Sequence, residues 1–444
     1  MRRLLLPLLI VLLAAARPAA AVCTAADVMA CGNNCWTCVG NTCTLSKLLT
    51  VTPPTPAATC TFDFGARDVV LKSGGNGGFT AAQNAFEIRA HGLTIDTNGT
   101  LKASGNQVTP GGIITLTLGA GGLTVLKKAN MIDLTGAEMA GSFSAGGGTF
   151  IVQSDGNVTI DGPGVAADGT TPNAQGGNVL ITAGRYAGTT LVVAGNIVVT
   201  GPVSVTAKTN GSGGNVTLTA NGGTVDVENQ IQVAGGSSGG SISTQSDKDT
   251  TLGTIPSGGP LFVADGTGDA GSGGCIDVFA RGKIGGNNGV TGRTLARGSN
   301  AFVTTNGGGC GGMVSIDAVG PLVLGGGSNG GIDVSGGQLG FGGSICLMTE
   351  NSGADLTLGS PLAASAAGLG SGGGCIDVCS AGRALLQSDI DASGDCGGAV
   401  CVGALSDISV NAPAQSIRAD GGGSVDLCAG GLVTLASPLL SAAE

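Results

Sequence analysis

Pairs of glycines are followed along most of the chain by short segments in which apolar and polar residues alternate. The second and fourth residues after each pair are apolar almost without exception, whereas the third is mixed. Alternation with a period of two is typical of a strand that buries one face, and the β-branched residues at the second position suit a pleated sheet. The pattern therefore predicts one recurring strand after each of the pairs that begin at Gly111, Gly147, Gly176, Gly213, Gly239, Gly273, Gly311, Gly342, Gly373, Gly397 and Gly422.

Two further apolar segments belong to each repeat. One leads into the next glycine pair and often ends in Asp-Gly, Ser-Gly or Ala-Gly, and another lies between, as in Ile197-Val-Val-Thr-Gly201. Asp or Ser before glycine indicates a turn in which the glycine takes a positive φ and an aspartate caps its own backbone. The segments that lead into a pair start at Ile231, Ile332, Ile390 and Ile417.

Three strands per repeat, recurring in the same phase, predict an all-β protein. The expected fold is a right-handed parallel β-helix, a solenoid of about eleven coils that fills residues 61–444. At about 4.8 Å per coil it would form a rod of roughly 50 Å. The competing fold is an antiparallel sandwich or propeller, whose hairpins would need two-residue turns at even spacing.

Composition narrows the kind of protein further. The 86 glycines suggest disorder, but hydrophobic residues make up 42% of the chain and charged residues only 11%, which is opposite to the balance of disordered chains. With aromatic residues at 3%, we expect a thin, aliphatic core. A formal net charge of −10 disfavours nucleic acid as a partner, because phosphate binding needs clustered Lys and Arg.

Residues 1–21 have the features of a signal peptide. Arg2 and Arg3 precede an apolar segment from Leu4 to Ala16, and small residues at 19–21 offer a cleavage site before Val22. The apolar segment is shorter than the ~20 residues that span a bilayer. We therefore expect export and release, to the medium or the cell surface, with no transmembrane segment. A lipoprotein anchored at Cys23 is the alternative, which Val22 disfavours.

Export decides how the fourteen cysteines are interpreted, because an oxidising compartment favours disulfides. Residues 22–60 form a Cys-rich module that ends in a Pro/Thr-rich linker at Thr50–Thr59. We expect this module, with Phe79–Ala90 as a further contributor, to cap the exposed strands of the first coil. Zinc is the alternative for its closely spaced cysteines. The disulfide candidates in this region are Cys23, Cys31, Cys35, Cys38, Cys43 and Cys60.

Eight further cysteines follow in the C-terminal part, and five of them fall on outward positions of successive coils. No two share a column on adjacent coils, and diagonal neighbours would place their Cα atoms about 8 Å apart, beyond the ~7 Å limit for a disulfide. Intercoil bridges therefore need a local register shift or turn cysteines such as Cys310 and Cys396, and free thiols are the alternative. The disulfide candidates here are Cys346, Cys375, Cys379, Cys396, Cys401 and Cys428.

The repeat also resembles a known family. The pattern Gly-Gly-x-Val-x-Leu, followed by Ile-Asp-Ala-Ser-Gly at Ile390–Gly394, is similar to the filamentous-haemagglutinin-like and pectin-lyase-like right-handed β-helices of bacterial exported proteins. The resemblance covers about residues 65–440 and implies a large surface adhesin or exoprotein. The Asn-Pro-Asn-Gly motif of two-partner secretion does not occur, and no C-terminal autotransporter barrel is evident.

Candidate catalytic groups are sparse. Asp277, Asp377 and Asp426 share the third column and Asp317 lies in the fifth, so the acids are two or more coils apart, roughly 10 Å or more, which is too wide for a tight dyad. His91, the only histidine, would have to serve any Ser-His-Asp triad, and we expect it in a turn. A calcium loop at Asp265–Asp269 is the alternative to a plain turn. We assign no catalytic, cofactor-binding or metal-binding residue.

The sequence therefore predicts a non-enzymatic, secreted or surface-associated structural protein of adhesin-like type. Its expected partners are cell-surface components or other copies of itself, joined through the C-terminal edge. The alternative is an extracellular polysaccharide lyase or hydrolase on a β-helix scaffold, which would need acids clustered on adjacent coils.

Overall fold

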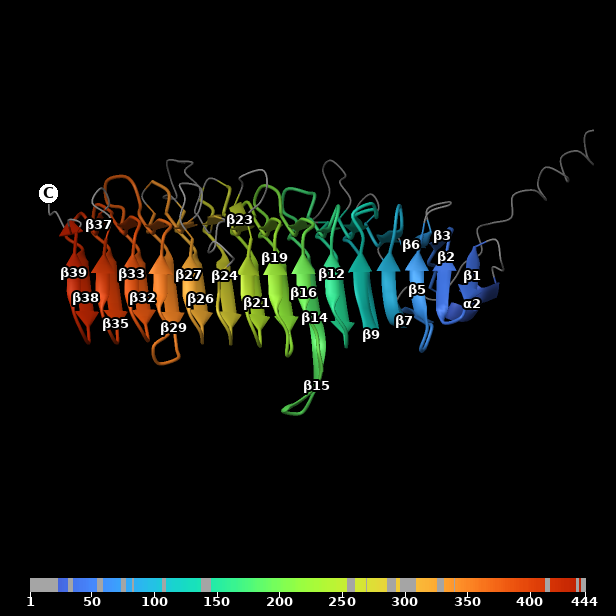
Figure 1. Cartoon of the computed structure of the whole chain (residues 1–444). Helices are drawn as coiled ribbons and strands as arrows, with labels where there is room; N and C mark the ends of the chain where they lie inside the picture. The colour runs from blue at the N-terminus through green and yellow to red at the C-terminus, as the bar shows by residue number, and fades with distance from the viewer. Residues whose placement is uncertain are drawn as a thin grey trace, which may run out of the picture.

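The chain forms an elongated body in which β-strands lie side by side in sequence order (Figure 1). The computed structural model describes residues 23–30, 35–53, 59–72, 77–81, 84–105, 109–136, 145–253, 260–268, 270–285, 293–295, 309–325, 331–338, 340–411, 416–436 and 439–440. These residues are nearly all β, and the helix among them is α2 (Ala25–Ala30). The predicted signal peptide, Cys31, Asp269 and much of the linker lie outside the described residues.

The strands form parallel ladders that run the length of the body. The first ladder, part of a 21-stranded sheet, contains β4 (Cys60–Asp63), β7 (Ala85–Ile95), β9 (Ile113–Val125), β11 (Thr149–Ser154), β14 (Asn178–Ala187), β18 (Asn215–Ala220), β21 (Ser241–Ser246), β24 (Cys275–Ala280), β26 (Met313–Ala318), β29 (Ser344–Thr349), β32 (Cys375–Ser380), β35 (Ala399–Ala404) and β38 (Ser424–Ala429). These are the strands that the glycine pairs predicted, with two more before Gly111.

The second ladder continues the same sheet around a corner and passes through the C-terminal halves of β7 and β9. Its other strands are β2 (Thr42–Leu45), β5 (Asp68–Leu71), β12 (Val158–Ile160), β16 (Ile197–Val199), β19 (Val225–Val227), β22 (Thr250–Leu252), β27 (Leu322–Leu324), β30 (Leu356–Leu358), β33 (Ala384–Leu386), β36 (Ile408–Val410) and β39 (Val433–Leu435), the last five grouped as a separate sheet. Ile284 bridges Thr250 and Leu322 and so joins the two parts.

The third ladder is a 14-stranded sheet made of the segments that lead into the glycine pairs. Its strands are β3 (Leu48–Thr50), β6 (Gly78–Thr80), β8 (Thr100–Lys102), β10 (Ile132–Asp133), β13 (Val165–Ala166), β17 (Val203–Ser204), β20 (Ile231–Gln232), β23 (Pro260–Val263), β25 (Arg293–Leu295), β28 (Gly331–Asp333), β31 (Leu362–Ala363), β34 (Ile390–Asp391), β37 (Ile417–Arg418) and β40 (Leu439–Leu440). Among the described strands only β1 (Trp36–Val39) with β2, and β15 (Thr190–Ala194) with β14, pair antiparallel. The parallel pairing excludes the antiparallel sandwich.

Successive repeats are in register, which aligns their core positions. β18 pairs residue for residue with β14 on one side and with β21 on the other. Val216 and Leu218, at the second and fourth positions, are fully buried, and the same two positions are buried in every repeat from β9 to β35. The predicted apolar columns are therefore confirmed, and they form one continuous core.

The paired glycines are required for close packing between backbones. A Cβ at Gly342 would lie 1.7 Å from the Ala364 carbonyl oxygen of the third ladder, and one at Gly343 would lie 2.0 Å from the Gly312 carbonyl oxygen of the preceding repeat. The first members of most other pairs have an equivalent neighbour. Most repeats thus have no room for a side chain where the third ladder turns into the first.

The prediction for the turn before each pair is only partly correct. Gly421 has a φ of +86°, but Gly235, Gly336 and Gly394 are not among the positive-φ glycines. There too a Cβ would meet neighbouring backbone, so close approach rather than backbone conformation selects glycine. An aspartate caps its own backbone earlier in the segment than predicted, because Asp391, three residues before Gly394, accepts a hydrogen bond at Oδ1 from the Ser393 backbone N–H at 2.9 Å.

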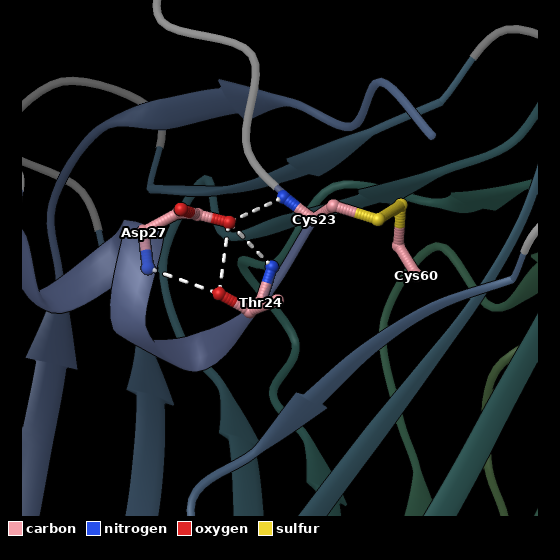
Figure 2. Close-up of a disulfide and its surroundings, with 4 residues drawn as sticks. All are labelled: Cys23, Thr24, Asp27 and Cys60. Atoms are coloured by element: carbon pink, nitrogen blue, oxygen red, sulfur yellow. Dashed lines mark hydrogen bonds between the residues drawn. A yellow bond between two sulfur atoms is a disulfide. The ribbon is translucent and has the colours of Figure 1, made fainter. Parts of the chain in front are cut away.

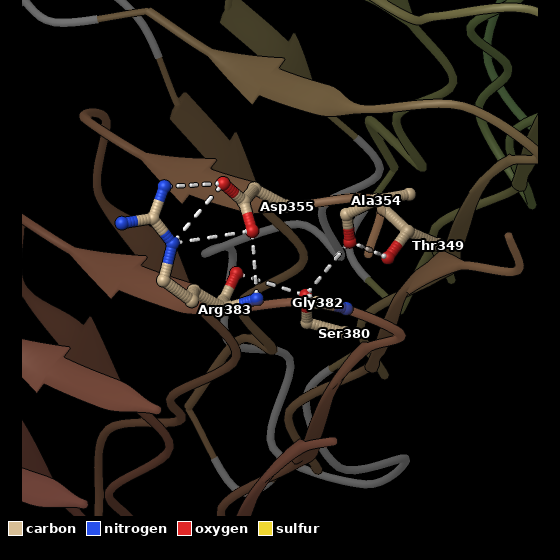
Figure 3. Close-up of polar contacts among 6 residues, drawn as sticks. All are labelled: Thr349, Ala354, Asp355, Ser380, Gly382 and Arg383. Carbon is tan, nitrogen blue, oxygen red and sulfur yellow. Dashed lines mark hydrogen bonds and ion pairs between the residues drawn. The ribbon is translucent and has the colours of Figure 1, made fainter. Parts of the chain in front are cut away.

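Polar side chains hold the corner between the first and second ladders. In Figure 3, Asp355 Oδ1 accepts the backbone N–H of Arg383, which lies one repeat further on, at 2.8 Å, and the guanidinium of Arg383 binds the same carboxylate. The hydroxyls of Thr349 and Ser380 donate to the Ala354 carbonyl inside this corner. At other corners a side-chain oxygen accepts a backbone N–H of the next repeat in the same way. The acceptor and donor residues are Asn157 and Asn196, Asn196 and Thr224, Asp249 and Lys283, and Asp407 and Leu432.

The N-terminal region departs most from the sequence-based picture. β2 and β3 pair with β5 and β6, so part of the Cys-rich module continues the same ladders. The core here contains aromatic rings besides aliphatic side chains: the rings of Phe62 and Phe79 lie 4.6 Å apart between centroids, and Trp36 stacks on Phe64 at 5.0 Å. Aromatic side chains thus contribute to the core before Gly111, where no glycine pair directly precedes β4 or β7.

Candidate functional site

The N-terminal cysteines that the structure describes form disulfides, as predicted in preference to zinc. Cys23 is bonded to Cys60 and Cys38 to Cys43, and Cys35 is also disulfide-bonded. Figure 2 shows the first bond beside a helix start in which Asp27 Oδ2 accepts the backbone N–H groups of Cys23 and Thr24. These hydrogen bonds, with one from the Thr24 hydroxyl, lower the pKa of Asp27. The bond between Cys23 and Cys60 ties α2 to the first ladder.

The C-terminal cysteines are free thiols in the structure, in place of the intercoil bridges that the sequence predicted. The register keeps them in separate columns: Cys346 faces Asp377 on β32, and Cys401 faces Asp377 from the other side. No local register shift brings two of them together in the described strands. The free thiols are Cys275, Cys310, Cys346, Cys375, Cys379, Cys396, Cys401 and Cys428.

Five of these thiols lie in surroundings that disfavour the thiolate. Partial burial is the main cause that raises the pKa of Cys275, Cys346, Cys375, Cys379 and Cys401. The carboxylate of Asp277 adds to this for Cys275, and that of Asp377 for the other four. Because the thiolate is the nucleophile, these side chains are poorly suited to nucleophilic catalysis.

The predicted spacing of the column-three acids is confirmed, but a closer acid pair was missed. Asp277, Asp377 and Asp426 are separated along their column by Ser315, Cys346 and Cys401. Asp317, in contrast, shares a hydrogen bond with Glu350 at the end of the next strand. Glu350 is the seventh residue after the pair Gly342–Gly343, beyond the alternating positions of the repeat, so the repeat pattern does not indicate this acid pair.

Asp317 titrates far from its usual range. Burial, then the charge of Glu350 and the hydrogen bond with it, raise the pKa of Asp317 to about 6. Its Oδ1 atom is buried without a hydrogen-bond partner among the described residues. Burial and a like charge nearby both disfavour the carboxylate, so Asp317 keeps its proton up to a pH of about 6.

Replacing Asp317 by Asn should therefore stabilise the protein at pH 8 but not at pH 4. The folded pKa of about 6 exceeds the ~3.9 of an unfolded Asp, so the contribution of Asp317 to stability is most favourable below pH 4 and is lost as pH rises through 6. After allowance for solvent screening we expect a gain of about 1 kcal/mol at pH 8. Urea unfolding at both pH values measures it, with the exposed Asp426→Asn as the control. Equal effects of D317N at pH 4 and pH 8 would contradict the assignment.

His91 has one of the two partners that a triad requires. Its Nδ1 lies 2.7 Å from Asp68 Oδ1, and both side chains are exposed by more than two fifths. No described serine hydroxyl is hydrogen-bonded to the ring. The His91–Asp68 pair therefore has an orienting carboxylate but no nucleophile.

The remaining sequence candidates are structural where the structure describes them. The Asp265 carbonyl accepts the Gly235 N–H of the preceding repeat at 3.0 Å, and Gly266 bridges Gly235, which ties this turn to its neighbour. The possible calcium loop ends at Asp269, outside the described residues. Asn215 Nδ2 donates to Asn178 Oδ1 at 2.9 Å, which joins two neighbouring repeats.

A hairpin interrupts the outer face in one repeat. The ends of β14 and β15 project away from the body in Figure 1. Beside them lies a cleft of about 660 Å³ whose polar lining includes Arg89, Gln153, Asp155, Arg185 and Tyr186. Arg185 pairs with Asp155 at 3.0 Å, and the Tyr186 hydroxyl donates to Asp247. This cleft, which no sequence pattern indicated, can hold a polar ligand against the hairpin.

Two properties of the described residues bear on membrane and metal binding. None of their helices is long and apolar enough to cross a bilayer. No three of their His, Cys, Asp or Glu side chains converge closely enough to hold a metal ion as they stand.

Comparison with known proteins adds no family to this picture. No protein-family model, no curated protein and no solved structure matches the chain.

Proposed function

We propose that the chain is a right-handed parallel β-helix of the filamentous-haemagglutinin-like kind, exported by its N-terminal segment to the bacterial surface or the medium. In this proposal it acts as a non-enzymatic, adhesin-like structural protein. The disulfides of the N-terminal module support an oxidising, extracytoplasmic location.

One observation carries the proposal most directly: the third ladder is a single parallel sheet of 14 strands, and the first ladder beside it stays in phase. Stacked repeats that contact only their neighbours give a stiff rod and long, continuous outer faces. Such a rod suits the display of a binding surface away from a cell. The hairpin and its cleft are our candidate for that surface, because there the regular outer face is interrupted by polar and charged side chains.

A binding assay tests the adhesin-like role. The fluorescently labelled chain, purified without residues 1–21, should bind intact cells or their isolated surface polymers. A variant in which residues 186–193 of the hairpin are replaced by a two-glycine turn should bind at least tenfold more weakly and keep its β-sheet circular dichroism. Arg383→Ala, a change at the same corner several repeats further along the body, is the control. Undiminished binding by the hairpin variant would reject the cleft as the adhesive site.

The second candidate is a polysaccharide-cleaving enzyme, and the pair Asp317–Glu350 is the observation in its favour. A carboxyl group that stays protonated near neutral pH can act as a general acid. Incubation with a panel of neutral and acidic polysaccharides, with and without Ca²⁺, separates the two proposals. We expect no new reducing ends or unsaturated products. Turnover that is lost in Asp317→Asn would overturn the structural role.

A further inference from the structure

Four thiols surround one carboxylate on the outer face of the C-terminal half. Asp377 occupies the third position of β32, with Cys375 and Cys379 two residues away on the same strand. Cys346 is its register partner on β29 and Cys401 its partner on β35. All five positions point outward, and each thiol is at least partly accessible. We call these four cysteines the thiol cross.

The thiol cross cannot close into disulfides within the chain. A cysteine of the centre strand and one of a flanking strand are diagonal neighbours, with Cα atoms about 8 Å apart in a regular parallel sheet. That exceeds the ~7 Å that a disulfide tolerates. The strands here pair without a bulge, so the backbone offers no shorter route. The structure accordingly keeps all four as free thiols.

The same separation suits a metal ion between two sulfur atoms. A metal–thiolate bond of about 2.3 Å on each side places the sulfurs about 4.6 Å apart when the ion lies between them, against about 2.05 Å in a disulfide. These additional ~2.5 Å between the sulfurs are more than the difference between the Cα separation of a diagonal pair, about 8 Å, and the ~7 Å that a disulfide tolerates. The Cys375 thiol already donates to Asp377 Oδ2, with sulfur and oxygen 3.7 Å apart, so it points toward the centre of the cross.

The geometry also restricts the kind of ion. One tetrahedral centre would need all four sulfurs within bonding distance of a single point, whereas Cys375 and Cys379 are four residues apart on an extended strand, about 13 Å. No three metal-binding side chains of the described residues converge, which agrees with this restriction. An ion that binds only two thiolates does not need four sulfurs to converge on one point, so this geometry does not exclude it. Soft cations, of which Cu(I) is the biological example, prefer thiolate ligands.

We propose that the thiol cross binds soft, thiophilic cations of the Cu(I) type, each held between one thiolate of β32 and one of a flanking strand. Two diagonal pairs can be occupied at once, so the cross holds two ions. Each coordinating thiol releases its proton to solvent as the sulfur–metal bond forms, and no oxidant or reductant is consumed. This site is independent of the proposed adhesin-like role.

Two double variants with the same number of thiols test the geometry. The parent for these variants is the full chain with Cys396 and Cys428 replaced by serine. Removal of Cys346 and Cys375 from this parent leaves the diagonal pair Cys379 and Cys401. Removal of Cys346 and Cys401 instead leaves two cysteines that lie on one strand and cannot share an ion. Cu(I), supplied anaerobically as its acetonitrile complex, is titrated against a chromophoric Cu(I) chelator, and circular dichroism checks the fold of each variant.

We expect two tightly held Cu(I) ions in the parent, one in the first double variant and none in the second. A further variant of the parent, Cys275→Ser with Cys310→Ser, removes two thiols outside the cross and should retain both ions. Equal retention by the two double variants would show binding to thiols regardless of position and would overturn the proposal. So would a parent that surrenders all copper to the chelator, or loss of an ion in the Cys275 and Cys310 control.

Discussion

Replacing Gly342 by alanine should abolish the native fold or lower its stability by about 4 kcal/mol, at the upper end of single substitutions. A Cβ at this position would lie 1.7 Å from the Ala364 carbonyl oxygen and 2.5 Å from the Gly374 backbone nitrogen. Both atoms are backbone of neighbouring ladders, and their strands are held on both sides, so neither can move without breaking ladder hydrogen bonds. We expect a fall in the thermal midpoint or loss of soluble protein.

Gly403 provides the matched control on the same body. It lies in β35, and a Cβ there would meet nothing within 4 Å. Gly403→Ala should leave the thermal midpoint unchanged or raise it slightly, because alanine reduces the entropy of the unfolded chain. If both substitutions have the same effect, close backbone packing is not what selects the paired glycines.

Removal of residues 22–60 should cause the protein to aggregate. The deletion takes away β2 and β3, which pair with β5 and β6, and uncovers unpaired strand edges that recruit other chains. It also removes Trp36 from its stacking partner Phe64. The expected result is loss of the monomer peak in size-exclusion chromatography, with a lower thermal midpoint for the remaining soluble protein. A truncated chain that stays monomeric and equally stable would rule out the capping role.

Disulfide variants separate the contribution of the two disulfides to the N-terminal cap from that of the strands. Cys23→Ser with Cys60→Ser opens a link across 37 residues, and Cys38→Ser with Cys43→Ser a link across 5. Loop-closure entropy predicts losses of about 4 and about 2 kcal/mol respectively. Neither variant removes a strand, so both should be less stable than the parent and yet remain monomeric. Aggregation as severe as that of the deletion would assign the cap to the disulfides rather than to the strands.

The repeat could be predicted from sequence because the same pattern of apolar positions recurs after many glycine pairs. Val216, Leu218 and their equivalents follow a glycine pair at fixed offsets, so one misleading residue, such as Thr244 at a buried position, does not obscure the period. The N-terminal ladders were harder to predict, because Phe62, Phe79 and Phe86 contribute to the core there and no glycine pair directly precedes β4 or β7. Low average aromatic content concealed their concentration at one end.

The candidate site was less predictable because it depends on residues between and beyond the repeated positions. Glu350 reaches Asp317 from outside the aligned strand, and β15 is an insertion that only one repeat carries. The thiol columns, in contrast, followed directly from the register. Their free state did not follow, because intercoil bridges were expected and only the unshifted register of the structure shows that the diagonal distance is not shortened. Residues at fixed positions of the repeat could be located from the sequence, whereas contacts made by turns and insertions could not.

Distances between spin labels at the third position of different repeats test the continuous stack most directly. Genetically encoded labels at Thr115 on β9 and Ser315 on β26 lie six strand spacings apart in the first ladder, and labels at Thr115 and Asp426 on β38 lie ten apart. At about 4.8 Å per spacing, pulsed electron paramagnetic resonance should give about 29 and 48 Å, with narrow distributions. Distances that do not grow in proportion to the number of repeats would contradict a single rod of stacked, in-register strands.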